Sequence, residues 1–180
     1  MHTKSIALES NFKWFKLARL GLLLVLALLI PSLGLPQAIT GPLVNALLIL
    51  TVETVGLGAA LVVGMITPMA ALLRGVLPLP LMVMIPFIAL GNAMLAGVYN
   101  ALRTRNRWLA LTAGAAAKFL LLFAAVTWLV ARPLNLVVGG AAQPVALPVS
   151  LIQMMTWPQF VTALTGGLIA FGVLGLVKRK

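Results

Sequence analysis

The sequence predicts an all-α integral membrane protein, a bundle of six transmembrane helices that forms a single domain over residues 1–180. Hydrophobic residues make up 62% of the chain and charged residues only 8%, whereas soluble domains average about 25% charged residues. The cations gather just outside long apolar runs. The net charge of +11 therefore indicates the flanks of helices in a lipid bilayer, and no nucleic-acid partner is expected.

Six segments are apolar enough to be candidate spans. A helix needs about 20 mostly apolar residues to cross a hydrocarbon core about 30 Å thick. Helices are favoured because backbone groups in lipid must be paired internally, and no segment alternates as a barrel strand does. The second and third spans are short and barely separated, so four or five spans are an alternative. The predicted spans are approximately 17–33, 43–56, 57–73, 81–102, 108–131 and 158–177.

The distribution of cations tests this topology. With a cytoplasmic amino terminus, six spans place ten cations, in residues 4–19, 103–107 and 178–180, on the cytoplasmic side. Only Arg74 and Arg132 fall outside, so the positive-inside rule predicts that both termini are cytoplasmic. The first span also resembles a signal peptide. Residues 33–39 are a poor cleavage site, however, and an uncleaved span is expected.

Small residues in the last two spans predict close helix packing. Residues without bulky side chains let helix backbones approach each other in a membrane, so the expected role is structural. The residues concerned are Ala113, Gly114 and Ala117 in the fifth span and Gly166, Gly167, Gly172 and Gly175 in the sixth.

Polar side chains at membrane depth are costly and usually face a cavity or a partner. Lys118 lies about ten residues into the fifth span, and Asn92 lies about eleven residues into the fourth. Lys118 is predicted to contact a ligand, with a structural pair to Glu53 as the alternative. Asn92 is expected either to contact a ligand or to bond a neighbouring helix. Arg132, fourteen positions after Lys118, returns to nearly the same face of the helix.

Lys118 and Asn92 are expected to belong to a polar pocket. Four further residues are predicted at the outer side of that pocket. Arg74, at the outer end of the third span, either closes the pocket or lies among lipid head groups. Asn45 is expected near the outer end of the second span, as a cap, a loop contact or a ligand contact. Gln153 and Gln159 flank the start of the sixth span. Prolines are predicted to bend the third span and to stiffen the loop after it, namely Pro68, Pro78 and Pro80.

No catalytic residue, metal site or cofactor is predicted. The chain has no cysteine and one histidine, His2, and its two acids, Glu9 and Glu53, lie on distant segments. Paired carboxylates, metal clusters and catalytic triads are therefore not expected. The sequence also lacks a phosphate-binding loop of the GxxxxGK[ST] type, so transport driven by ATP would need another subunit.

Three stretches resemble the substrate-binding S component of energy-coupling factor (ECF) transporters. They are the run from GPLVNALL to GNAML at 41–95, AAAKFLLLF at 115–123, and PQFVTALTGGLIA at 158–170. The G-x-ITP motif at 64–68 and the proline-rich third outer loop also agree with that family. The chain departs from it in the first span, where no two alanines have the Ala-x-x-x-Ala spacing of the family's docking face.

The resemblance implies a multi-pass protein of a bacterial plasma membrane that captures a vitamin or related micronutrient from outside. It also implies docking on a transmembrane T subunit that carries two ATPase subunits. The alternative is a non-transporting anchor or assembly subunit of a larger membrane complex. An anchor should tolerate loss of Lys118 and Asn92 provided that the bundle packs, whereas a binding protein should not.

Overall fold

The computed structural model describes residues 2–75, 82–131, 134–138, 141–145 and 149–177, and most of them are helical. Five helices are long and apolar enough to cross a membrane, and α3, with 17 residues, is shorter. The described chain is therefore a multi-pass helical membrane protein. The helices of the bundle, with the shorter α3 included, are α1 (His2–Ser32), α2 (Gln37–Thr54), α3 (Leu57–Leu73), α5 (Ile85–Leu102), α6 (Arg107–Val130) and α8 (Trp157–Val177).

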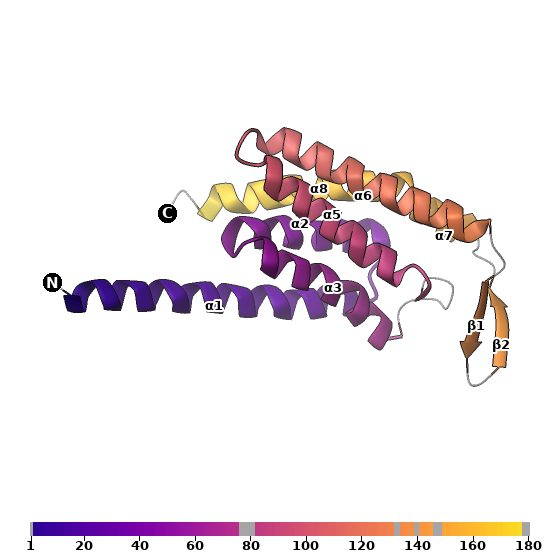
Figure 1. Ribbon diagram of the computed structural model, residues 1–180, viewed down its shortest axis with the longest axis horizontal. Coiled ribbons are helices and arrows are strands. Elements are labelled where there is room, and N and C mark those ends of the chain that lie inside the picture. The colour runs from indigo at the N-terminus through magenta and orange to yellow at the C-terminus, as the bar shows by residue number, and fades with distance from the viewer. Residues whose placement is uncertain (1, 76–81, 132–133, 139–140, 146–148, 178–180) are drawn as a thin grey trace.

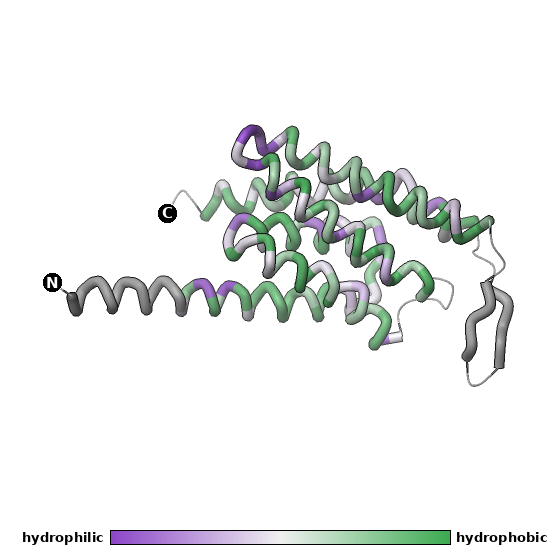
Figure 2. Tube along the Cα trace, in the orientation of Figure 1, coloured by the Kyte–Doolittle hydropathy of each residue, from purple (hydrophilic) through white to green (hydrophobic). Residues whose placement is uncertain are grey.

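The helices run side by side in a bundle (Figure 1). Helix α2 packs against α8, and α5 packs against both α3 and α6, while α1 lies against α2 and α3. The α2–α3 and α5–α6 turns lie at the same end as the carboxyl end of α8. Figure 2 shows hydrophilic residues gathered at the α5–α6 turn. We call this end of the bundle the cationic end, because it carries the basic residues Lys16, Arg19, Arg103, Arg105 and Arg107.

Local sequence explains where the helices at the cationic end begin. The Asn106 side-chain oxygen accepts hydrogen bonds from the backbone N–H groups of Trp108 (2.8 Å) and Leu109 (3.1 Å), which caps α6. Gly56 separates α2 from α3 with a φ of +127°, a value that side-chain-bearing residues rarely adopt. A two-residue turn can therefore reverse the chain between two helices.

The second helix begins six residues before the predicted boundary, at Gln37 rather than Leu43. Pro42 lies inside α2, where its missing N–H leaves only one earlier carbonyl without its helix bond. As a consequence Asn45 lies in the middle of α2 and is buried, so its predicted place near the outer end of the span is wrong.

Other boundaries also differ from the predicted ones, and one element was not predicted from the sequence. Helix α1 extends back to His2, and α5 begins at Ile85 rather than near residue 81. After α6, strand β1 (Leu134–Val138) pairs antiparallel with β2 (Ala141–Val145), and the short helix α7 (Val149–Met154) follows. The described fold is thus helical with one added hairpin. Pro78, Pro80 and Arg132 lie outside the described residues.

Glycine contacts confirm part of the predicted packing. A Cβ at Gly166 would lie 2.5 Å from the Pro42 carbonyl oxygen, and one at Gly114 would lie 3.0 Å from that of Leu95. A Cβ at Gly167 would overlap the Leu111 side chain. The added atoms at Gly172 and Gly175 would meet nothing within 4 Å, so no close approach depends on those two glycines.

The outside of the bundle is apolar, as a lipid-facing surface requires. Exposed apolar area this extensive would associate in water, whereas the bilayer core solvates it. Large exposed side chains occur on every long helix, among them Leu22, Val25, Met65, Leu73, Leu90, Leu120, Phe123 and Leu168.

Candidate functional site

Lys118 is held between two asparagines in the middle of the bundle. Its Nζ donates hydrogen bonds to Oδ1 of Asn45 (2.7 Å) and to Oδ1 of Asn92 (2.8 Å). The lysine comes from α6, Asn45 from α2 and Asn92 from α5, and all three side chains are buried. We call these three residues the lysine cluster.

The chemistry of an ammonium group fixes how the two amides face. An ammonium group has three N–H donors and no acceptor, so both asparagines must turn their oxygens toward it. Their Nδ2 groups then face outward: Asn45 donates to Thr162 Oγ1 (3.5 Å), and Asn92 donates to the Gly64 carbonyl (3.0 Å) and Thr67 Oγ1 (3.3 Å). The network therefore ties α2, α3, α5, α6 and α8 to one charge.

Two glycines make room for this network. A Cβ at Gly91 would lie 3.3 Å from Lys118 Cγ, and one at Gly64 would lie 3.1 Å from Asn92 Cβ. Both distances are tighter than ordinary van der Waals contact. Gly64 therefore lets α3 approach α5, and Gly91 lets α5 approach α6, so that Asn92 reaches both the Gly64 carbonyl and the lysine.

A cavity of about 420 Å³ reaches from the α1–α2 connection to the lysine cluster. Lys118 and Asn92 line it at mid-bundle, and Thr67 adds a hydroxyl group beside them. The remaining walls are mostly apolar. They include Pro31, Leu35, Pro36, Val44, Pro68, Ala71, Ile88, Met154 and Met155. The cavity thus combines a polar floor with apolar sides.

Two glutamines bind one carbonyl at the rim of the cavity. Gln37 Nε2 donates to the Met154 carbonyl (3.2 Å), and Gln159 Nε2 donates to the same oxygen (3.1 Å). Gln37 begins α2 and Gln159 lies in the first turn of α8, so the shared acceptor joins two helices to the end of α7. Both glutamines line the cavity, at the end of the bundle opposite the cationic end.

Two exposed tryptophans lie on either side of the lysine along α6. Trp108 and Trp128 are at least half exposed on α6 and are twenty positions apart, which a helix spans in about 30 Å. That length equals a typical hydrocarbon core, at whose two interfaces tryptophan concentrates. Lys118 is ten positions from each and therefore lies halfway between them along α6.

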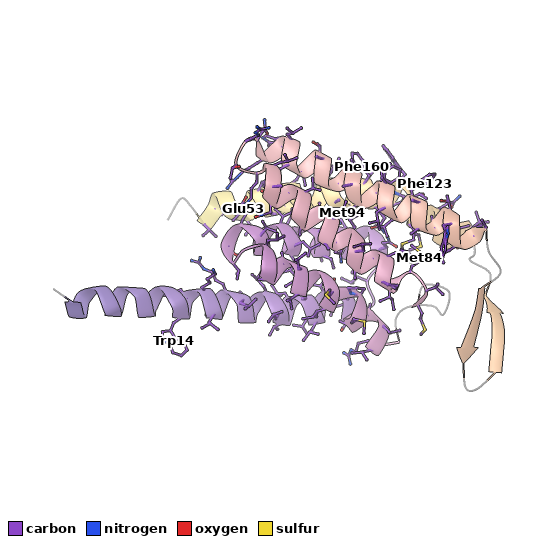
Figure 3. The ribbon with its side chains drawn as sticks, viewed as in Figure 1. Trp14, Glu53, Met84, Met94, Phe123 and Phe160 are labelled. Carbon is purple, nitrogen blue, oxygen red and sulfur yellow. The ribbon has the colours of Figure 1, made fainter. Side chains whose placement is uncertain are left out.

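Glu53 does not pair with Lys118, so that alternative is wrong. Its carboxylate accepts hydrogen bonds from Tyr99 Oη (2.7 Å) and Arg107 Nη2 (2.9 Å), and Arg103 Nη1 lies 3.5 Å away. Figure 3 places Glu53 at the cationic end of the bundle. The carboxylate belongs to a separate ion cluster, because Arg103 and Arg107 flank the α5–α6 turn on the neighbouring helices.

The structure brings four of the six predicted site residues together. Lys118, Asn92 and Gln159 line the cavity, and Asn45 bonds the lysine from behind it. Arg74 is exposed at the carboxyl end of α3, and Gln153 is exposed on α7. Neither of those two side chains is among the described residues that line the cavity.

Several polar residues of the site were missed by sequence reasoning. Gln37 and Thr40 were assigned to a loop, because the second span was started at Leu43. Thr67 stands in the ITP motif directly before Pro68, where a count of polar residues within spans would have found it. Thr162 would have emerged by the same count on the last span.

These features define a multi-pass membrane protein with a buried cation at the floor of an internal cavity. Comparison of the chain with protein-family models, curated proteins and solved structures finds no match.

Proposed function

We propose that the chain is the membrane-embedded substrate-binding subunit of an ECF-type uptake transporter, and that it captures a small polar or anionic solute from outside the cell. The observation that carries the proposal is the buried Lys118 in the middle of the bundle, bound to Asn45 and Asn92 at the floor of a 420 Å³ cavity. The sequence resemblance to S components supports the same class.

The cost of the lysine argues for a ligand. Charged groups within a membrane are rare and usually serve a pathway or a binding site. A purely structural cross-link between helices would not need an adjacent cavity, and this volume falls within the range of about 300–1,000 Å³ that is usual for small-molecule sites.

The donors that face the cavity favour a ligand with an anionic or strongly accepting group. Two of the three N–H groups of Lys118 are taken by asparagine oxygens, which leaves one for a ligand. The described carboxylate, Glu53, is engaged by Arg107, so no described acid neutralises Lys118. An anionic ligand would supply that charge where screening by water is weak. Apolar walls would receive the rest of a vitamin-like molecule.

The orientation follows from charge. The positive-inside rule assigns the cationic end to the cytoplasm and the cavity to the outer side, with six spans and both termini cytoplasmic. The location proposed is a bacterial plasma membrane. Because the chain has no nucleotide-binding loop, we expect uptake to require a T subunit and two ATPase subunits.

Native mass spectrometry of the protein purified from its own membrane tests the proposal. The wild-type chain should retain a small molecule, the Lys118→Met variant should lose it, and the Arg74→Gln variant, altered outside the cavity, should keep it. Coexpression with the T subunit and ATPases should then give uptake that stops when the nucleotide site is disabled.

A different set of results would favour the membrane-anchor alternative. In that case no molecule would be retained, and the Lys118→Met variant would assemble with its partners as well as the wild-type chain does. ATP-independent accumulation by this chain alone would instead indicate a secondary carrier.

A further inference from the structure

A second cavity, of about 290 Å³, lies at the cationic end between α1 and the α2–α3 turn. Three cations line it, Lys16 and Arg19 from α1 and Arg103 from the end of α5. Glu53 is the one acid among the lining residues, and Phe15 adds an aromatic ring. The cavity is therefore basic, and it is distinct from the cavity that reaches Lys118.

The cations of this cavity are incompletely neutralised. Glu53 is bound by Arg107 and Tyr99, at 2.9 Å and 2.7 Å. Lys16 and Arg19 are exposed and form no ion pair with any residue whose side chain the structure describes. The Nε of Arg103 is a buried donor without an acceptor among those residues. Buried donors are normally satisfied, so a ligand oxygen would complete this site.

The backbone beside the cavity also favours an anion. Val55 and Gly56 line it, and α3 begins at the next residue with no side chain capping its amino end. Free N–H groups at the start of a helix and the positive end of its dipole attract anions. The cations and the helix end therefore act in the same direction.

The cavity lies at the depth of lipid head groups. Trp14, on the same stretch of α1, and Trp108 are 70% and 60% exposed, as expected for side chains at a membrane interface. We propose that the cavity binds the phosphate of an anionic phospholipid head group. Basic pockets between helices near the cytoplasmic surface suit such head groups, whereas the extra cation of a zwitterionic head group would be repelled. This site goes beyond the proposed solute capture and does not depend on it.

The test uses the full chain in nanodiscs of mixed phosphatidylglycerol and phosphatidylcholine, with retained lipids counted by native mass spectrometry. The wild-type chain should retain phosphatidylglycerol selectively. Arg19→Gln should weaken that retention about fivefold, the value of one cation near a charged membrane surface. Arg105→Gln is the matched control, because Arg105 is an exposed cation at the same end but outside the cavity.

A melting temperature measured in phosphatidylcholine alone verifies that each variant folds, and Lys16→Gln replaces Arg19→Gln if the latter does not. The proposal is overturned if the wild-type chain shows no preference between the two lipids, or if Arg105→Gln weakens retention as much as Arg19→Gln does. Displacement of the lipid by inorganic phosphate would also overturn it and would assign the cavity to a soluble anion.

Discussion

Lys118 and Asn92 come from neighbouring helices and are joined by a hydrogen bond of 2.8 Å in the middle of the bundle. The bond is one half of a bridge, because Asn45 accepts from the same ammonium group at 2.7 Å. An ammonium group held by two neutral amides is oriented without being neutralised. Its charge therefore remains available to a molecule in the cavity.

Asn92→Leu should destabilise the bundle. The leucine would remove an acceptor of Lys118 and the donor to the Gly64 carbonyl while keeping similar bulk. We expect a loss of roughly 1–2 kcal/mol in the free energy of unfolding, since hydrogen bonds between helices in membranes are worth less than buried polar groups in water-soluble cores. Denaturation by SDS in mixed micelles measures this quantity.

Asn100→Leu is the control for that experiment. It makes the same change on the same helix, at a half-buried asparagine whose side chain forms no hydrogen bond with the described residues. Equal losses for the two variants would mean that the Asn92 bonds contribute nothing specific to stability.

Lys118→Met and Glu53→Gln should have additive effects on stability. The two clusters are separate: Arg107, which binds Glu53, is eleven positions from Lys118, or about 16 Å along α6. Sites this far apart usually add within about 0.5 kcal/mol. A double-mutant cycle on the free energy of unfolding measures the coupling, and rescue of Lys118→Met by Glu53→Gln would contradict the structure.

The depth of polar residues could be predicted from the sequence, but their partners could not. Counting from the span boundaries placed Lys118 and Asn92 at matching depth, because helix rise per residue is constant. The choice between Glu53 and another partner depends on how each helix is rotated and which neighbours it has. The positions of the spans determine neither the rotation of a helix nor its neighbours. In the structure the partners of Lys118 are the side-chain amides of Asn45 and Asn92.

Prediction from the sequence failed at the start of the second span and at the hairpin of β1 and β2. The predicted second span began directly after Pro42, but α2 continues through this proline, whose carbonyl faces Gly166 of α8. That error placed Asn45 near the end of a span and left Gln37 outside the second span. The hairpin of β1 and β2 was missed although a Gly-Gly pair, common in hairpin turns, separates its strands in the sequence.

Gly166→Ala should weaken the contact between α2 and α8. Its Cβ would lie 2.5 Å from the Pro42 carbonyl oxygen and 2.7 Å from Asn45 Cβ, so the helices must separate. Overpacking of this kind costs about 1–3 kcal/mol, and the shift would draw Asn45 away from Lys118. Thermal unfolding and retention of the bound small molecule should therefore decline together.

Gly172→Ala provides the comparison on the same helix, because its Cβ would meet nothing within 4 Å. It should leave stability unchanged or raise it slightly, since alanine favours helices over glycine by up to about 1 kcal/mol. A loss equal to that of Gly166→Ala would show that helix propensity, and not the α2–α8 contact, governs the effect.

The orientation of the bundle can be tested with reporters that are active on one side of the membrane only. A reporter fused after Lys180 should report the cytoplasm, and one inserted between Gly139 and Gly140 should report the exterior. A third, inserted between Arg105 and Asn106 in the α5–α6 turn, should agree with the first, because that turn and the end of α8 lie at the same end of the bundle. The reason is the charge difference between the two ends: Lys16, Arg19 and the arginines of the α5–α6 turn lie at one end, and Arg74 lies at the other.

If the reporters at Lys180 and Gly139 report the same side, the six-span arrangement is wrong. If all three report the reverse of the expected sides, the cavity opens to the cytoplasm and solute capture from outside is excluded.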